Sequence, residues 1–185
     1  MYAKAQGAHI IGVVRSDNSP RKGSAGLIDE LSTLGLVVAG VYTEVESVKK
    51  IESQETYVQL HFPHGIHEIS YVKEELGRKV ISVVFAHNEL SPIDAAMEKI
   101  SQGADLVLLE YGKEGWAAYN HKIPELYGYP IGVAGKVSKE NLGGLVRYSP
   151  YFIDISSSLE DAPGKKSHSK IKQFMEVLHA ETAIV

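Results

Sequence analysis

Short apolar runs alternate with longer segments of helical periodicity along the whole chain, and this alternation restricts the fold more than any other feature. Most of the runs are apolar on both sides of the β alternation, which is typical of parallel strands covered on both faces. Strand-helix-strand repetition requires right-handed crossovers and a parallel sheet, either closed as a barrel or open and doubly wound. The predicted strands are His9–Val14, Leu36–Tyr42, Tyr57–Leu60, Lys79–Phe85, Leu106–Glu110, Ile131–Ala134 and Phe152–Ile155.

The segments between these strands predict helices. The last segment is the clearest, because Ile171, Phe174, Met175 and Leu178 recur at three and four residues and give one buried stripe. The chain opens on what looks like the tail of a further helix, Ala3–Gly7, with no strand before it. The predicted helices are Ser24–Leu34, Val45–Glu52, Ile66–Leu76, Pro92–Ser101, Lys139–Tyr148 and Ser167–Ala180.

Composition narrows the classes of protein that fit. A chain of 185 residues with 44% hydrophobic and 23% charged residues predicts one globular domain over 1–185. The formal charge of −4 disfavours a nucleic-acid partner, and the lack of a long apolar stretch disfavours a membrane span. The chain has no cysteine, which excludes disulfides and thiolate chemistry and favours a cytoplasmic protein.

The C-terminal third carries the most specific motif. The run Phe152–Glu160, then Pro163-Gly164-Lys165-Lys166 and a final amphipathic helix, resembles the closing segment of phosphoribosylanthranilate isomerases. Other pieces resemble the same family in the same order along nearly the whole chain. They are Ile11–Val14 with Ser19–Arg21, Gly40–Tyr42, Val58–His61, Ala104–Glu110, and Ala134–Val137 with Glu140–Asn141.

This resemblance implies a TIM-barrel-like (βα) fold with the active site at the carboxyl ends of the strands. It implies an enzyme of tryptophan biosynthesis whose substrate is a phosphorylated small molecule and which needs no cofactor or metal. The family's reaction is an Amadori rearrangement that opens a ribose ring and moves a proton. Such a reaction needs a general acid for the ring oxygen and a general base for the C2 proton.

The family begins with a strand that carries Lys-Ile-Cys-Gly, and that cysteine is the base. Here both the strand and the cysteine are absent. A barrel of seven strands has two edges with unpaired backbone groups, so we expect something to fill the gap. The alternatives are Thr182–Val185, a partner chain or second copy, lateral closure of the remaining sheet, or a gene assignment that begins too late.

Two carboxylates are the candidate catalytic residues. Glu110 stands where the family has its acid, an aspartate that ends the sixth strand. Glutamate reaches one methylene further, and a misplacement of about 1 Å can cost on the order of a hundredfold in rate. Asp154 lies two residues before the serine pair, and it either recognises or polarises the substrate or bonds to neighbouring strand ends as a structural aspartate.

The resemblance also gives candidate substrate-binding residues. Arg21 would grip the anthranilate carboxylate, because a guanidinium matches a carboxylate in shape and charge. His61 ends a strand, and its alternative is a purely structural role. Gly135 and Lys136 replace the family's phosphate-binding Gly-Gly, where lysine supplies a point charge. Ser156 and Ser157 complete the predicted phosphate site.

Two further patterns invite interpretation. His61, His64 and His67 suggest a metal cluster, but they span a turn and a helix start without a carboxylate companion, so we predict no metal site. Glu44, after the second predicted strand of this chain, is the one carboxylate suggested as a replacement for the lost base.

Three functions stay open at this point. The first is a phosphoribosylanthranilate isomerase that works with relocated groups or a supplied first strand. The second is a catalytically impaired relative that binds a phosphorylated small molecule or acts as an assembly partner. The third is a different sugar-phosphate isomerase.

Overall fold

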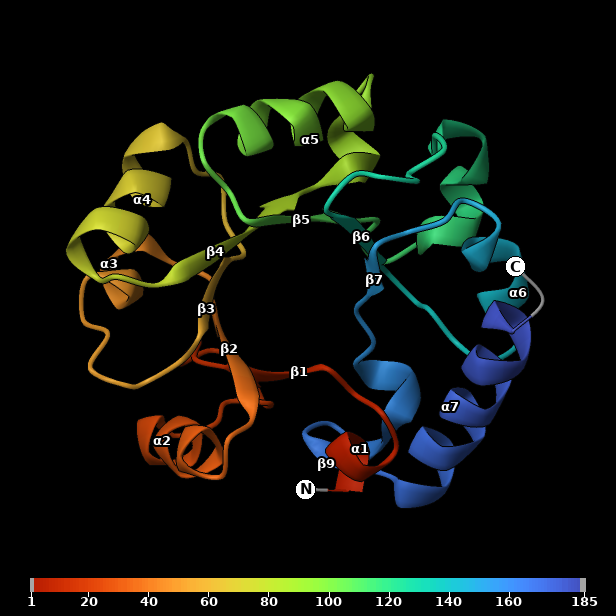
Figure 1. The fold of residues 1–185 in the computed structure, drawn as a ribbon, viewed down its shortest axis with the longest axis horizontal. Coiled ribbons are helices and arrows are strands. Elements are labelled where there is room, and N and C mark those ends of the chain that lie inside the picture. Colours follow the sequence, from red (N-terminus) through yellow and green to blue (C-terminus); the bar gives the residue numbers. More distant parts are fainter. Residues whose placement is uncertain (1, 184–185) are drawn as a thin grey trace. The chain divides into compact units, whose positions relative to one another are not determined.

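A computed structural model describes residues 2–183, which form two compact units. The first unit holds residues 8–83 and 99–106. Its four strands pair in chain order, and every pair is parallel (Figure 1). The strands are β1 (Ile10–Val14), β2 (Val37–Tyr42), β3 (Tyr57–Leu60) and β4 (Lys79–Val84). The connecting helices are α2 (Ala25–Thr33), α3 (Val45–Val48) and α4 (Ile66–Ser70), the last followed by a π-helical turn, Tyr71–Glu75.

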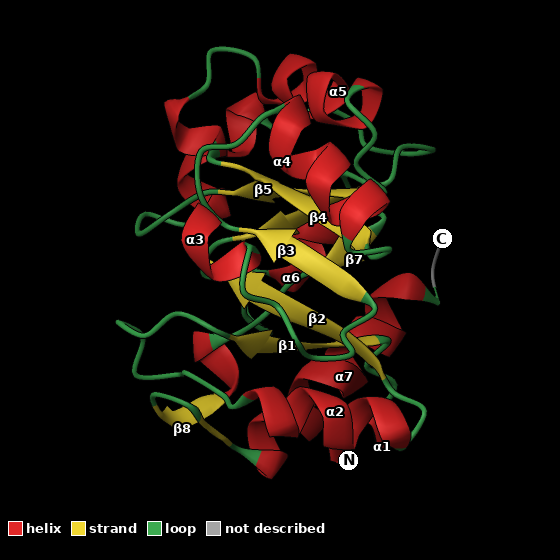
Figure 2. Cartoon of the chain, turned by 90° about the vertical axis from the view of Figure 1, so that its left-hand side faces the viewer, coloured by secondary structure: helices red, strands yellow, loops and turns green. Residues whose placement is uncertain are grey.

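Helix α2 shows why the local sequence folds as it does. Ser24 caps the helix, because its hydroxyl oxygen accepts a hydrogen bond from the Leu27 N–H at 3.1 Å. One face of α2 packs on β1 and β2, as Figure 2 shows, through Ile28 and Val38, which are fully buried. Burial of this face gives the first unit one of its hydrophobic clusters.

The second unit holds residues 2–7, 84–98 and 107–183. Its strands β5 (Leu106–Glu110), β6 (Ile131–Ala134) and β7 (Phe152–Ile153) are parallel and pair in chain order. Helices α6 (Leu142–Val146) and α7 (His168–Thr182) lie side by side (Figure 1). The other elements are α1 (Tyr2–Ala5), η2 (Ala86–Asn88), α5 (Pro92–Ser101, which ends in the first unit), η3 (Trp116–Lys122), η4 (Ser157–Leu159), β8 (Glu160–Ala162) and β9 (Lys165–Lys166).

All the predicted strands are present, and three keep their predicted bounds. The strand predicted over Phe152–Ile155 ends at Ile153, although the Asp154 N–H still donates to the Val133 carbonyl at 3.0 Å. The chain then turns into η4, which frees the residues after Asp154 from the sheet. Within residues 2–183, no helix has the length and apolar character that a membrane crossing requires.

Two helix predictions were too long. The helix predicted over Val45–Glu52 ends at Val48. The one predicted over Lys139–Tyr148 is reduced to α6, whose interior contains Gly143 and Gly144. Helix-interior glycines cost about 1 kcal/mol each relative to alanine. Here they permit close packing, because a Cβ on Gly144 would lie 3.1 Å from the Trp116 ring.

The start of the chain packs on α7 in the second unit. The Tyr2 ring stacks on His168 with 4.1 Å between centroids. The opening helix predicted over Ala3–Gly7 is present but ends at Ala5. At the other end, Thr182 belongs to α7 and Ala183 is its C-cap. These residues are therefore helical rather than the strand suggested for Thr182–Val185, and Ile184 and Val185 lie outside the described residues.

Candidate functional site

The carboxyl ends of β5, β6 and β7 form one edge of the sheet in the second unit. Glu110 is in register with Ala134, and Val133 with Ile153. The ladder continues one step beyond each strand, since the Tyr111 N–H donates to the Ala134 carbonyl at 3.3 Å. Glu110, Gly135 and Asp154 therefore follow one another along this edge, where such folds place their chemistry.

The Glu110 carboxyl is held at this edge and is partly withdrawn from water. Its Oε1 accepts a hydrogen bond from the Gly112 N–H at 2.9 Å. Burial raises the pKa of Glu110 above the ordinary carboxyl value, and the negative charge of Asp154 raises it further. The Gly112 N–H and His87 act in the opposite direction and do not outweigh burial. A carboxyl with a raised pKa keeps its proton to higher pH, as a general acid must.

His87 lies against the backbone of Glu110 and Gly112, and sequence reasoning missed it. It belongs to η2, and its Nδ1 lies 3.4 Å from the Glu110 carbonyl oxygen. The ring also fills the space beside Gly112, where an added Cβ would lie 3.1 Å from the ring Cε1. Gly112 has φ +65°, so glycine suits both its conformation and this close approach. No motif marks His87, because 23 residues separate it from Glu110.

The loop after β6 has a fixed and unusual backbone. Gly135 has φ +107° and Lys136 has φ +50°, which is uncommon for a residue with a side chain. Asn141 fastens the loop, since its Oδ1 accepts from the Ser138 N–H and its Nδ2 donates to the Lys136 carbonyl, both at 2.9 Å. The Gly135 carbonyl accepts from the Trp116 N–H at 3.0 Å. Successive residues with such φ values can form the backbone concavities that bind anions.

The segment after β7 is tied to the same loop. The Ser158 hydroxyl donates to the Val137 carbonyl at 2.6 Å. Lys166 donates to the Ser156 carbonyl at 2.9 Å and pairs with Glu160 at 3.0 Å. The pair β8–β9 brings the exposed Lys166 to the serine segment. Ser157 is exposed beside it.

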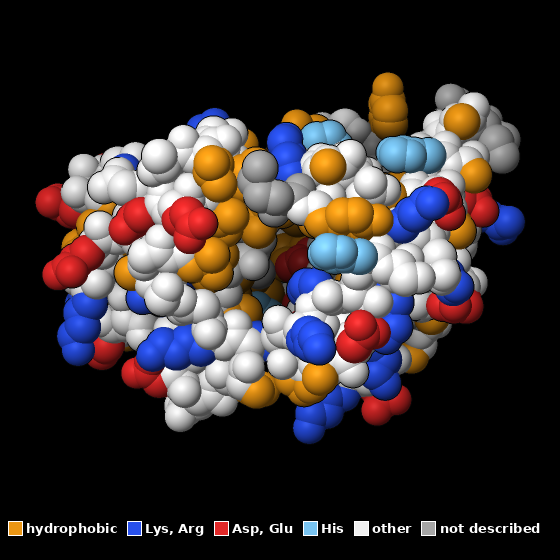
Figure 3. All heavy atoms as spheres, turned by 90° about the horizontal axis from the view of Figure 1, so that it is seen from below, with side chains coloured by type: hydrophobic (Ala, Val, Ile, Leu, Met, Phe, Trp, Pro, Cys, Tyr) orange, Lys and Arg blue, Asp and Glu red, His pale blue; other side chains and the backbone are white. Residues whose placement is uncertain are grey.

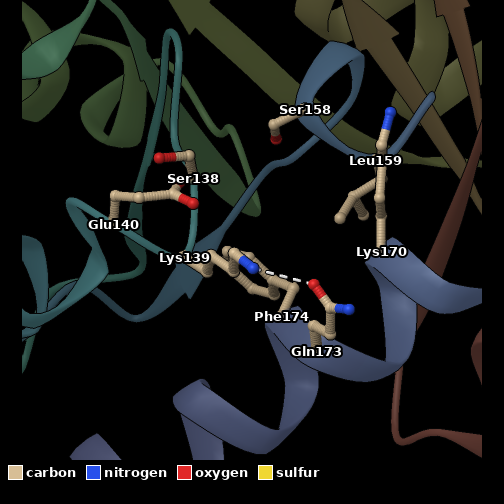
Figure 4. A pocket seen from close by; sticks show the side chains of 8 residues that line it. All are labelled: Ser138, Lys139, Glu140, Ser158, Leu159, Lys170, Gln173 and Phe174. Carbon is tan, nitrogen blue, oxygen red and sulfur yellow. Dashed lines mark hydrogen bonds between the residues drawn. The ribbon is translucent and has the colours of Figure 1, made fainter. Parts of the chain in front are cut away.

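A cavity of about 200 Å³ opens where the β6–α6 loop, η4 and α7 meet (Figure 4). The Lys139 ammonium donates to the Gln173 Oε1 at 2.8 Å across it. Figure 3 shows Lys or Arg side chains and His side chains, with Asp and Glu side chains among them, on the right-hand part of the face seen from below. The cavity is lined by Ser138, Lys139, Glu140, Ser158, Leu159, Lys170, Gln173 and Phe174.

The predicted site residues divide between the two units. Arg21 and His61 belong to the first unit. The Arg21 N–H donates to the Ser19 hydroxyl at 3.2 Å, and the His61 N–H extends the strand ladder by donating to the Tyr42 carbonyl at 2.8 Å. The other predicted residues, Glu110, Asp154, Gly135, Lys136, Ser156 and Ser157, belong to the second unit and follow its strand ends.

The histidines after β3 are engaged in the first unit. His64 places Nδ1 2.6 Å from the Phe62 carbonyl oxygen and Nε2 2.9 Å from the Ser82 hydroxyl, so both ring nitrogens have partners. Burial lowers the pKa of His64. Across residues 2–183, no group of three or more His, Cys, Asp or Glu side chains gathers as metal ligands would. Glu44 is exposed at the N-cap position of α3, where its side chain makes no cap hydrogen bond, and its role as a base stays a prediction.

Comparison with known proteins identifies the family. The sequence model of the N-(5′-phosphoribosyl)anthranilate isomerase family matches residues 2–177 of this chain. The chain belongs to this family. The isomerase of Thermoplasma volcanium is 39% identical over 91% of this chain and 84% of its own length.

Solved structures of the family agree in fold. The enzyme from Thermotoga maritima aligns with a TM-score of 0.79 at 23% identity, covering 97% of this chain and 92% of the other. A family member in complex with reduced 1-(o-carboxyphenylamino)-1-deoxyribulose 5-phosphate aligns with a TM-score of 0.75 at 24% identity, covering 97% and 91%. The predicted TIM-barrel-like fold with about seven parallel strands is confirmed. The prediction of a single domain stays a prediction.

The raised pKa of Glu110 has a consequence for stability. A group whose pKa is higher in the folded than in the unfolded protein stabilises the folded state fully at a pH below its unfolded pKa. This contribution is lost as pH rises through the folded pKa. We therefore expect the free energy of unfolding of the native protein, relative to Glu110→Gln, to fall as pH rises above the ordinary carboxyl pKa of about 4.3. Urea unfolding at several pH values measures this, and a constant or rising difference would contradict a raised pKa.

Proposed function

We propose that this chain catalyses the Amadori rearrangement of N-(5′-phosphoribosyl)anthranilate to the aminodeoxyribulose phosphate in tryptophan biosynthesis. The observation that carries the proposal is the Glu110 carboxyl, which ends β5 beside Asp154 and has a raised pKa. A protonated carboxyl at a strand end can give its proton to the ring oxygen, and this step opens the ribose. Membership of the family indicates which reaction the chain catalyses, and Glu110 is the acid of that reaction.

Asp154 and the phosphate loops have complementary roles in this proposal. Asp154 keeps a negative charge near Glu110 and so helps to hold the Glu110 proton. Gly135 and Lys136 present backbone in left-handed conformations, and Ser156 and Ser157 add hydroxyl groups. Together these residues would hold the substrate phosphate, with the ammonium of Lys136 as a counter-charge.

The remaining predictions belong to the same proposal. Arg21 would bind the anthranilate carboxylate, and His61 would orient the substrate. A second copy or a partner chain would complete the sheet. The edge position of β1 supports this, since β2 is the strand with which β1 pairs, and its further bridge joins Val14 to the nearby Lys22. Light scattering of the purified chain measures its oligomeric state. A cytoplasmic location fits the absence of cysteine.

A growth experiment tests the proposed function. The gene is expressed in a bacterial strain that lacks its own phosphoribosylanthranilate isomerase, on medium without tryptophan. We expect growth with the native gene and none with Glu110→Gln at equal soluble expression. Absence of growth with the native gene, at a level of soluble chain that suffices for a known isomerase, would contradict the proposal and favour a binding-only relative.

A further inference from the structure

The proposed reaction needs a base as well as an acid, and the chain has no cysteine to provide a thiolate. The base must reach the C2 proton while the acid reaches the ring oxygen. In a furanosylamine, C2 and the ring oxygen are both bonded to C1. The two groups that serve them can therefore lie side by side, provided that both face the same bound sugar.

His87 lies beside the proposed acid. Its ring stands against the Glu110 carbonyl and beside Gly112, whose N–H holds the Glu110 carboxyl. The other histidines of the second unit lie on η3 and α7. Among the described residues of this unit, His87 is the imidazole with a contact to Glu110.

The hydrogen bonding of His87 decides which of its two ring nitrogens can accept a proton. A carbonyl oxygen can only accept, so the Nδ1 that faces the Glu110 carbonyl at 3.4 Å carries the proton in the neutral ring. The other nitrogen, Nε2, then keeps its lone pair. This arrangement, with one ring nitrogen held by a carbonyl and the other free to accept a proton, suits a general base.

We infer that His87 is the general base of this chain and takes the C2 proton at Nε2. The inference rests on the proposed function. In the first step Glu110 gives its proton to the ring oxygen, the C1–O bond breaks, and the nitrogen lone pair forms a C1=N iminium. In the second step Nε2 removes the C2 proton, and the C–H electron pair forms C1=C2 and neutralises the nitrogen.

The product of these steps is an enolamine, which becomes the ketone when C1 gains a proton and the C2 hydroxyl loses one. Protons and electrons balance without any oxidant or reductant. His87 in its charged form can return a proton, and Glu110 recovers its own from solvent. The relocated base thus stands next to the acid along one strand-end edge.

The first test compares two variants of His87 with a histidine control. Asn at position 87 keeps a donor for the Glu110 carbonyl but has no basic nitrogen. We expect His87→Asn to lower kcat on the order of 10²- to 10⁴-fold with little change in KM. His121→Asn, an exposed change in η3, should keep native activity. In His87→Ala, added imidazole should restore part of the lost rate, which a purely structural role would not produce.

Two outcomes overturn the inference. One is native kcat in His87→Asn while Glu110→Gln is inactive, and the other is a loss in His87→Ala that imidazole does not relieve. If the variants fail to fold, diethylpyrocarbonate modification of the native chain replaces them. Modification of His87, seen by mass spectrometry, should abolish turnover and be slowed by the reduced product analogue; modified chain with full turnover overturns the inference. No turnover by the native chain would instead overturn the proposed function, and the inference with it.

Discussion

Glu110→Gln is expected to lower kcat on the order of 10²- to 10⁴-fold, because the amide keeps the shape of the side chain but has no proton to give. The amide oxygen can still accept the hydrogen bond from the Gly112 N–H, so the loop should keep its conformation. Binding of the reduced product analogue should therefore change little. Steady-state kinetics and calorimetric titration of the same preparation separate the two effects.

The matched control for this change is Glu114→Gln. Glu114 lies in the same loop, is exposed, and should tolerate the amide without loss of rate. Glu110→Asp adds information on reach, since the shorter side chain withdraws the carboxyl by one methylene. A rate in Glu110→Gln equal to that of the native chain would show that Glu110 is not the acid.

Phe174→Ala is expected to destabilise the fold by about 3–5 kcal/mol, the usual cost of removing a buried phenyl ring. Phe174 is 1% exposed and lies under the cavity bounded by the β6–α6 loop and η4 (Figure 4). Urea unfolding gives the free energy. Glu176→Ala on the exposed face of α7 should change it by less than about 0.5 kcal/mol.

The same change should also raise KM, because the ring supports two segments of the proposed phosphate site. Loss of support would loosen the Ser158 hydroxyl bond to the Val137 carbonyl, which joins those segments. Kinetics at a temperature where the variant stays folded measure this effect. A decrease of less than about 1 kcal/mol in the free energy of unfolding of Phe174→Ala would contradict tight packing of α7 at this residue.

The strands were predicted well because short β-branched runs that are apolar on both faces are typical of buried parallel strands. Glu110 was identified through the family resemblance, because it stands where the family has its acid at the end of a strand. The helices were less predictable, and Val45–Glu52 shows why. Its β-branched residues are weak helix formers. Just beyond this segment, the Gln54 N–H donates to the carboxylate of Asp29 in α2 at 2.8 Å, which holds the chain outside a helix there.

The parts of the site that escaped prediction depend on contacts between distant segments. His87 follows β4 in a short 3₁₀ turn and meets Glu110 only in the folded chain. Lys166 is exposed, and it meets Ser156 and Glu160 only when β8 and β9 pair. Neither contact leaves a periodic or spaced pattern, so sequence reasoning could not detect them.

The most direct measurement is turnover of freshly prepared N-(5′-phosphoribosyl)anthranilate by the purified chain, followed as loss of anthranilate fluorescence above the spontaneous rate. Our account predicts measurable turnover that disappears in Glu110→Gln and survives in Glu114→Gln. No turnover together with tight binding of the product analogue would mean a retained pocket without catalysis. Absence of both turnover and binding would contradict the isomerase function itself.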